Sequence, residues 1–402
     1  MKKLTVLLSV ILCFCTLLCS CGESAVTTDT TKDTVSTQDF SSADMTTQTT
    51  AVSTAATTIS VIQPGLELPD IAPGTAVRIE LDFNKKTVVS AGKTFGKKLG
   101  NLDTLSGWKS SDFVSIGSCY GFSYELPATA NLISIALFDK DRKYITGVGT
   151  SSNTSAATTV QGFIESPENA AFVRILHYSG TSAMPEFKTS TLIAYGDKET
   201  FESAKSTRKY NDLVIACIGD SLTEGDYAGT PGVANRQFET YPYFLSKALG
   251  CTTVNYGKCG ASIQVILNNI TAGEINIAEA DVILLMIGTN RGLDGSYESY
   301  YRSAISNIRN KMKDGAVLVL VTPPTTTNSV HTDFVKSAYT KAKSISKELG
   351  LPLIDVYSGS PIQPENAEKY QPADGLHLNE EGYKALAEFI AAELEVILEK
   401  LK

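Results

Sequence analysis

Four strand-like segments in the second half of the chain limit its fold more than any other feature. They are residues 214–219, 252–256, 282–287 and 317–321, with a shorter fifth segment at 353–356. Three of the four are nearly unbroken apolar runs, which is typical of strands buried on both faces of a parallel sheet. Helical patterns at 241–249, 301–312, 334–349 and 383–397 alternate with or follow them. This alternation predicts a parallel sheet covered by helices on both faces, with right-handed crossovers.

Residues 61–205 carry a different pattern. Short β-rich segments at 77–83, 132–138, 171–176 and 191–195 are separated by turn residues, and no amphipathic helix stands between them. This pattern predicts an all-β antiparallel sandwich or jelly roll ahead of the α/β domain at 206–402. Its aromatic residues Trp108, Tyr120 and Tyr124 are either sugar-stacking platforms or core residues.

The first sixty residues are typical of a secretion signal and a tether. Lys2 and Lys3 precede a short apolar run, and residues 18–22 (Leu-Cys-Ser-Cys-Gly) resemble a bacterial lipobox. Cleavage before Cys21 and lipidation of its sulfur would anchor the protein at the extracellular face of the bacterial cell membrane. An uncleaved membrane span is the alternative, for which the run is short. We predict a signal peptide at 1–21 and a disordered, Ser/Thr-rich tether at 22–60.

Charge and cysteine content limit which binding partners, metal sites and disulfides the sequence predicts. The net charge of −8 and the lack of a basic cluster after Lys3 argue against a nucleic-acid partner. Of eight cysteines, four lie in or end the signal segment, and the spacing of the rest indicates neither a metal site nor a disulfide framework. A single bridge between Cys251 and Cys259 remains open.

The first predicted strand of the α/β domain stops at Gly219-Asp220-Ser221. A serine at this turn lies at the carboxyl edge of the sheet, where ligands bind in open α/β folds, although Asp and Ser are also common helix caps. Far downstream, Asp374 stands three residues before His377, one of only three histidines. Together these residues supply a nucleophile, a base and an orienting acid. His331, in the loop after the fourth strand, is the rival base.

Four blocks carry a resemblance to a known superfamily. They are Gly219-Asp220-Ser221-Leu222, Asn255 to Gly260, Gly288-Thr289-Asn290 and Asp374-Gly375-Leu376-His377. In this order the chain resembles the SGNH, or GDSL, hydrolases, and more loosely their carbohydrate-esterase members with an accessory β-sandwich. The resemblance implies a flavodoxin-like three-layer α/β/α fold and no cofactor or metal.

The resemblance also implies roles for particular residues. Ser221 would be the nucleophile, His377 the base and Asp374 its partner. The oxyanion hole would consist of the Ser221 and Gly260 backbone N–H groups and the Asn290 side chain. These donors matter because ester hydrolysis builds negative charge on the carbonyl oxygen.

Three further residues are candidates for substrate binding: Asp220, Tyr227 and Arg291. The superfamily commonly has Asp where this chain has Arg291. A solvated loop residue is the alternative for Arg291. Tyr241 and Tyr243 either line a sugar subsite with Tyr227 or pack a helix.

The sequence therefore predicts a cell-surface serine esterase that removes O-acyl groups, with O-acetyl favoured, from a polysaccharide or other glycan. The first alternative is a lipid acyl hydrolase, a lysophospholipase or thioesterase. The second is a glycan-binding surface lipoprotein without activity, against which the intact set Ser221, Asp374 and His377 argues.

Overall fold

The computed structural model describes residues 58–62, 70–81, 89–95, 102–128, 133–149, 158–180, 186–187, 190–227 and 239–400. All of them belong to one compact unit, Ser53–Lys402. The predicted signal peptide, with Cys21, and nearly all of the predicted tether lie outside the described residues. Strand β1 begins at Thr58, two residues before the predicted end of the tether. Among the described residues, no helix combines the length and apolarity needed to cross a bilayer.

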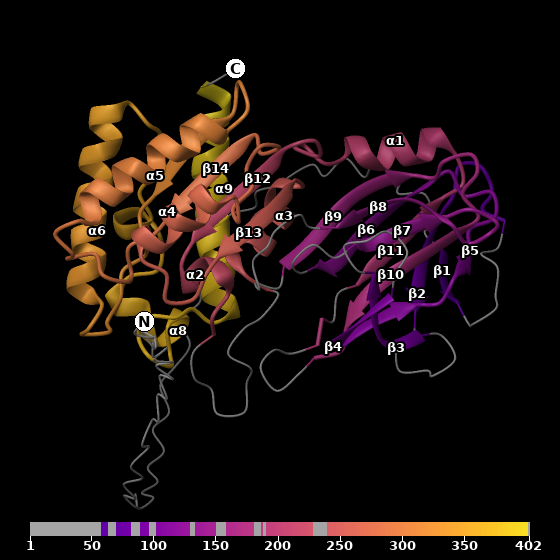
Figure 1. The fold of residues 1–402 in the computed structure, drawn as a ribbon, viewed down its shortest axis with the longest axis horizontal. Coiled ribbons are helices and arrows are strands. Elements are labelled where there is room, and N and C mark those ends of the chain that lie inside the picture. Colours follow the sequence, from indigo (N-terminus) through magenta and orange to yellow (C-terminus); the bar gives the residue numbers. More distant parts are fainter. Residues whose placement is uncertain are drawn as a thin grey trace, which may run out of the picture. The chain divides into compact units, whose positions relative to one another are not determined.

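The α/β part is built on a five-stranded parallel sheet (Figure 1). Its strands are β12 (Val214–Gly219), β13 (Thr252–Gly257), β14 (Val282–Met286), β15 (Val317–Val321) and β16 (Leu353–Ile354). They lie in the order β13-β12-β14-β15-β16, and every neighbouring pair is parallel. Numbered along the chain this is 2-1-3-4-5, the flavodoxin-like order. The predicted fold class is confirmed.

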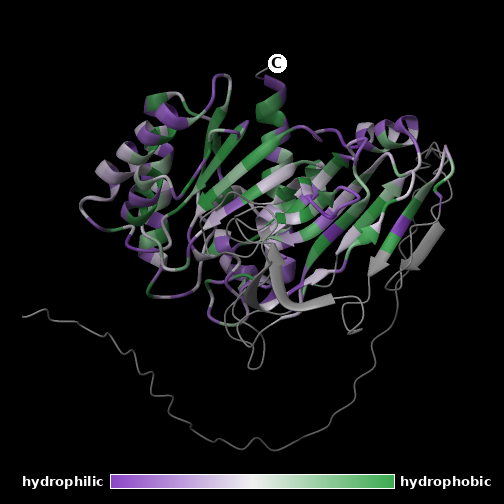
Figure 2. Ribbon diagram, turned by 45° about the vertical axis from the view of Figure 1, so that its right-hand side comes forward, coloured by the Kyte–Doolittle hydropathy of each residue, from purple (hydrophilic) through white to green (hydrophobic). Residues whose placement is uncertain are grey.

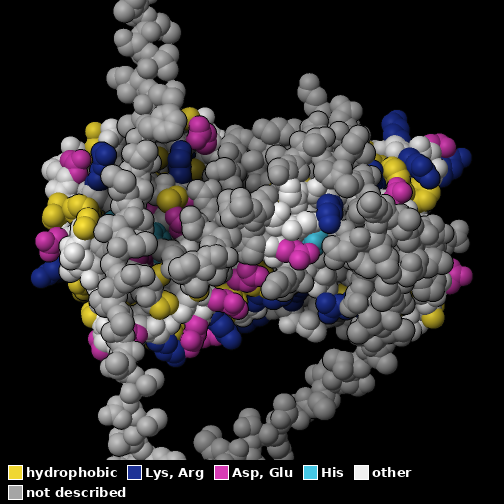
Figure 3. All heavy atoms as spheres, turned by 90° about the horizontal axis from the view of Figure 1, so that it is seen from below, with side chains coloured by type: hydrophobic (Ala, Val, Ile, Leu, Met, Phe, Trp, Pro, Cys, Tyr) yellow, Lys and Arg dark blue, Asp and Glu magenta, His cyan; other side chains and the backbone are white. Residues whose placement is uncertain are grey.

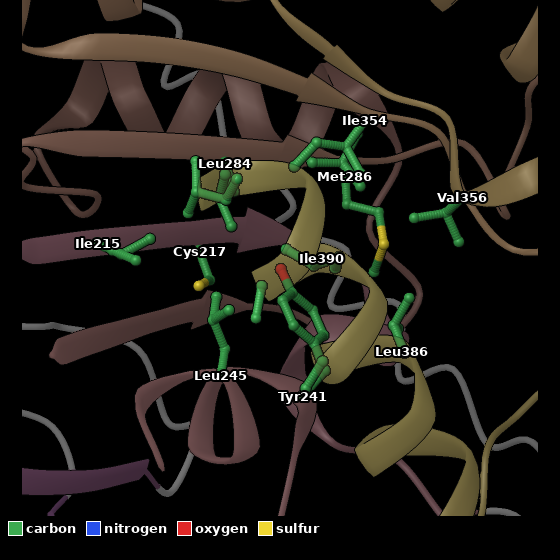
Figure 4. Close-up of a cluster of buried hydrophobic side chains, with 14 of the residues drawn as sticks. Ile215, Cys217, Tyr241, Leu245, Leu284, Met286, Ile354, Val356, Leu386 and Ile390 are labelled. Carbon is green, nitrogen blue, oxygen red and sulfur yellow. The ribbon is translucent and has the colours of Figure 1, made fainter. Parts of the chain in front are cut away.

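Alternate residues of each strand face opposite helical layers. Ile215 and Cys217 pack with helices α3 (Tyr241–Leu249) and α9 (Glu380–Lys400), in the cluster shown in Figure 4. Ala216 and Ile218 pack on the other face. That face is covered by α4 (Ile263–Ala272), α5 (Tyr297–Lys311) and α6 (Thr332–Leu349). In Figure 2 the central strands are largely green and the helices carry green and purple stripes, as expected for a sheet buried on both sides.

The remaining helices of the α/β part are short. They are α2 (Ser221–Glu224), α7 (Val356–Gly359), a 3-10 turn (Pro364–Asn366) and α8 (Ala367–Tyr370). The fifth predicted strand, 353–356, is shorter than expected, because Asp355 caps α7 instead of continuing β16. Helix α4 was not predicted, although Ile263, Ile266 and Ile270 follow helical spacing and are buried.

Two sheets make up the β-rich part. One contains β1 (Thr58–Ile62), β2 (Ala76–Leu81), β11 (Thr191–Tyr195), β6 (Gly121–Ala128) and β9 (Thr158–Glu165), in that order. The other contains β3 (Val89–Phe95), β4 (Leu102–Ser111), β10 (Phe172–Tyr178), β7 (Ile133–Phe138) and β8 (Tyr144–Gly149), and β5 (Val114–Ser115) pairs with β10. The pairing is antiparallel except between β1 and β2, which run parallel.

A shared core joins these two sheets into a sandwich. Phe122 and Leu126 of one sheet and Leu137 and Ile175 of the other belong to the same buried cluster. Helix α1 (Lys198–Ser206) packs on the sandwich through Phe201. Trp108 and Tyr124, considered above as sugar platforms, are only 4% and 6% exposed, so they are core residues. Tyr120 is half-buried.

The sandwich meets the parallel sheet along one strand. β9 lies beside β13, the outermost strand of that sheet. Gln161 Nε2 donates to Cys251 O at 2.8 Å, and Thr252 Oγ1 donates to Gln161 O at 3.3 Å. Nearby, the buried Glu125 carboxylate accepts hydrogen bonds from Tyr243 Oη at 3.0 Å and from Lys247 Nζ. Because Glu125 and Gln161 are buried, this contact excludes water and holds the two parts together.

Candidate active site

The carboxyl end of β12 places a serine at the point where the strand order reverses. β12 lies between β13 and β14, so the crevice beside its end is the switch point where open α/β folds bind ligands. Asp220 caps α2, and Ser221 is its first residue. Figure 3 views the molecule from below Figure 1, and the described acidic and basic side chains visible there are interspersed.

A continuous hydrogen-bonded chain links the three residues predicted to be catalytic. Ser221 Oγ lies 2.9 Å from His377 Nε2, and His377 Nδ1 lies 2.7 Å from Asp374 Oδ2. The other carboxylate oxygen of Asp374 accepts from the backbone N–H groups of Leu376 and His377, at 2.9 and 2.8 Å. A carboxylate only accepts, so His377 Nδ1 carries a hydrogen and Nε2 of the neutral ring can accept the serine proton. The geometry is that of a nucleophile, a base and an orienting acid.

The pKa shifts of His377 and Asp374 agree with this geometry. Burial alone would lower the pKa of His377, but the hydrogen bond and charge of Asp374, with the charges of Asp226 and Asp220, raise it above its ordinary value. Burial alone would raise the pKa of Asp374, but its bonds to His377 and to backbone N–H groups bring it down to about 2. Asp374 is therefore ionised across the neutral range and stabilises a protonated His377.

The three predicted oxyanion donors lie in loops that are tied together. In the described part of the chain, no hydrogen bond occupies the backbone N–H of Ser221 or of Gly260. Asn290 Nδ2 donates to the carbonyl of Ala261, next to Gly260, at 3.2 Å, and to Thr289 Oγ1, also at 3.2 Å. The Asn290 amide is thus held beside the loop that carries Gly260.

The loop after β13 is fastened to the serine turn. Lys258 N donates to Gly219 O at 3.1 Å, and Cys259 N donates to the buried carboxylate of Glu224. Gly257 lies so close to α2 that a Cβ there would stand 2.0 Å from Glu224 N. Of the two glycines in this block, Gly257 is required for close approach, and Gly260 adopts a left-handed φ of 68°.

The three residues predicted to contact substrate differ in exposure: Asp220 is buried, Tyr227 is half-buried and Arg291 is exposed. Asp220 is 1% exposed, and its oxygens accept from Leu222 N, Thr289 Oγ1 and Thr289 N, which speaks against contact with a substrate. Burial raises the pKa of Asp220, partly offset by those bonds. Tyr227 is half-buried within the described part of the loop after α2. Arg291 is exposed in the turn after Asn290, with a φ of 56°.

Tyr241 and Tyr243 are helix-packing residues. Tyr241 is fully buried in the core, and Tyr243 is 8% exposed and bonded to Glu125. Cys251 and Cys259 do not form a disulfide; the first is buried and the second exposed. The Cys259 thiol donates to Asp226 Oδ2 at 2.8 Å.

The sequence did not assign roles to Thr289 and Glu224. Thr289 Oγ1 donates to Asp220 at 2.5 Å and accepts from Asn290, so it connects the serine turn with the oxyanion loop. The position of Thr289 inside the third block was the sequence feature that could have indicated this role. His331, the rival base, does not contact Ser221; its Nδ1 lies 2.7 Å from Thr289 O. No cluster of His, Cys, Asp and Glu suited to a metal ion occurs in the portion that the structure describes.

Comparisons with known proteins find similarity over the α/β part of the chain. Residues 217–385 match the model of the GDSL-like Lipase/Acylhydrolase family. The lipase/acylhydrolase from Enterococcus faecalis aligns at 23% identity and TM-score 0.38, covering 46% of this chain and 96% of that one. A member of the lipolytic G-D-S-L family from Veillonella parvula aligns at 22% identity and TM-score 0.37, covering 46% and 98%.

A catalytic mutant of an acetylxylan esterase from Geobacillus stearothermophilus aligns at 18% identity and TM-score 0.36, covering 45% of this chain and 94% of that one. No curated protein matches the chain. The recognition of the superfamily from four blocks is confirmed over the α/β part. Residues 217–385 form a carboxylic ester hydrolase domain of the GDSL-like lipase/acylhydrolase family.

Proposed function

We propose that this protein is a serine esterase that removes short acyl groups, O-acetyl above all, from a glycan at the bacterial cell surface. The observation that carries the proposal is the hydrogen-bonded chain from Ser221 Oγ through His377 to Asp374. The polar surroundings of this chain favour a small acyl group on a hydrated substrate. Among the described residues near Ser221, Asp226, Cys259 and Asn290 are polar and hydrogen-bonded.

The reaction follows from the roles of these groups. Ser221 Oγ attacks the ester carbonyl carbon while His377 Nε2 takes its proton, and the carbonyl oxygen becomes an oxyanion. The N–H groups of Ser221, Gly260 and Asn290 stabilise that charge, each contributing about 3 kcal/mol. Collapse breaks the ester bond, and His377 returns the proton to the departing alcohol. Water then attacks the acyl-enzyme with His377 again as base, releasing the carboxylic acid and restoring Ser221.

Hydrolysis of p-nitrophenyl acetate tests the nucleophile. Ser221→Ala is expected to remove turnover while leaving the denaturation midpoint near that of the wild type. Ser262→Ala is the matched control, because Ser262 lies at the same edge, is half-buried and makes no cap bond with its side chain. Undiminished turnover by Ser221→Ala would reject the assignment. Acetate release from acetylated xylan, mannan, pectin and peptidoglycan then identifies the glycan.

A second candidate, hydrolysis of lipid acyl esters, is favoured by two exposed apolar side chains. Leu293 is 55% exposed three residues after Asn290, and Val330 is 66% exposed next to His331. The rates on acetate and octanoate esters separate the candidates. A faster rate on octanoate would favour the lipid substrate, because each added methylene is then bound by an apolar surface.

The surface location rests on the lipobox-like segment ending at Cys21. Expression in a bacterium with radiolabelled palmitate tests it. The wild-type protein should incorporate label and sediment with membranes, and Cys21→Ser should do neither. Label in the Cys21→Ser variant would reject lipidation at this residue.

A further inference from the structure

The loop between β15 and α6 lies outside the four motif blocks but touches two of them. On one side it contacts the turn that carries the base. Thr327 N donates to Gly375 O at 3.0 Å, and Asn328 Nδ2 donates to Asp374 O at 3.0 Å. The contact is close, because a Cβ at Gly375 would stand 2.4 Å from Thr327 Oγ1.

On its other side the loop contacts the oxyanion block through His331. His331 Nδ1 lies 2.7 Å from Thr289 O. A carbonyl oxygen can only accept, so Nδ1 carries the hydrogen and donates. The Thr289 carbonyl and the Asn290 nitrogen belong to one planar peptide unit, so this bond fixes the plane from which the Asn290 side chain extends.

The start of α6 shows that the His331 side chain serves the oxyanion block and not the helix. His331 occupies the N-cap of α6 but makes no side-chain cap bond, and histidine is not among the preferred cap residues. The same helix holds the far end of the oxyanion turn. Ser337 Oγ and Lys341 Nζ both donate to Gly292 O, at 3.0 and 3.1 Å.

Close packing leaves the oxyanion turn little room to move elsewhere. A Cβ at Gly288 would stand 2.2 Å from Ala338 Cβ, and one at Gly292 would stand 2.3 Å from Phe334 O. α6 therefore supports both glycines that flank Thr289 and Asn290, and the bond from His331 is the direct contact to the peptide between those two residues.

We propose that His331 is a positioning residue for ester hydrolysis, which holds the Thr289–Asn290 peptide so that the Asn290 amide faces the developing oxyanion. This inference rests on the proposed esterase activity and on the oxyanion role of Asn290. His331 acts through Asn290, and the loop 326–331 fixes the oxyanion block relative to the Asp374–His377 turn.

Kinetics on p-nitrophenyl acetate test the proposal. His331→Ala should lower kcat roughly 10- to 100-fold, the range expected when an oxyanion donor is displaced but not removed, with KM changed less than about threefold. His331→Asn keeps an N–H donor near the position of Nδ1 and should recover kcat to within about fivefold of the wild type. Lys336→Ala, an exposed residue of α6, is the control for a general effect on the helix.

A double-mutant cycle separates positioning from a structural role. In the Asn290→Ala background, His331→Ala should lower kcat less than about twofold further, because the group that it positions is gone. A full, multiplicative loss in that background would overturn the proposal, and so would an unchanged kcat in His331→Ala. A His331→Asn variant as slow as His331→Ala would also overturn it, and this variant remains informative if alanine impairs folding.

The outcome is distinguishable from failure of the esterase assignment. If Ser221→Ala keeps full turnover, the proposed function fails. If Ser221→Ala is inactive but the losses from His331→Ala and Asn290→Ala multiply, only the positioning role fails.

Discussion

Replacing Gly257 with alanine should test the close approach of β13 to α2 without changing any catalytic side chain. Gly257 is the last residue of β13. A Cβ at this position would stand 2.0 Å from Glu224 N and 2.5 Å from Glu224 Cα, whereas ordinary contacts lie at 3.4–4 Å. Both obstacles are backbone atoms, which cannot rotate away as a side chain could. Either β13 or α2 must move.

The cost follows from this geometry. Overpacking a core costs about 1–3 kcal/mol where side chains can adjust, so we expect at least about 3 kcal/mol here. Part of the overlap is relieved by displacing α2, which begins at Ser221. A displacement of about 1 Å at a reacting group lowers kcat roughly 100-fold. Gly257→Ala should therefore lose both stability and activity.

Gly273→Ala is the matched control. Gly273 ends α4 with a φ of 76°, and no atom lies within 4 Å of its hypothetical Cβ. Gly273→Ala introduces only left-handed backbone strain, which should lower the free energy of unfolding by about 1–2 kcal/mol. It should leave kcat unchanged. Urea denaturation gives the free energies of unfolding, and p-nitrophenyl acetate gives kcat. A Gly257→Ala protein with wild-type activity and a loss below about 1 kcal/mol would refute the steric argument.

Four further predictions concern the site and the contact between the two parts. Asp374→Asn should lower kcat roughly 10⁴-fold, because the amide no longer holds the productive tautomer of His377, and a loss below about tenfold would contradict that role. Since the pKa of His377 is raised and the neutral ring is the base, kcat/KM should rise with pH through a midpoint above the ordinary histidine value. Asp226→Asn removes one of the charges that raise that pKa, so the midpoint should move to lower pH; an upward shift would contradict the assigned charge effect. Glu125→Leu leaves the buried Tyr243 hydroxyl without its acceptor, and should cost about 1–3 kcal/mol in denaturation, with Glu125→Gln less affected; equal losses would show that hydrogen bonding there is unimportant.

Much of the catalytic centre could be predicted because its markers are local. An apolar strand that ends in Gly-Asp-Ser fixes Ser221 at the sheet edge, and the three-residue spacing of Asp374 and His377 places both in one short turn. The alternation of apolar strands with helices likewise predicts a layered α/β fold.

Contacts between distant loops could not be predicted. The bonds from His331 to Thr289 and from Thr289 to Asp220 join three loops that only the strand order brings together. Side-chain burial in the sandwich was also ambiguous, because alternation does not say which face of a strand meets the other sheet. Trp108 is a core residue, and the sequence alone could not distinguish it from a sugar-stacking residue.

The position of β9 beside β13 has a consequence for how the catalytic sheet can associate with other chains. An open sheet edge exposes unpaired amides and is a template onto which a neighbouring molecule can add a strand. The parallel sheet has one edge shielded by the sandwich, and its other edge strand, β16, is only two residues long. We therefore expect the accessory sandwich to hinder strand addition at this edge of the catalytic sheet.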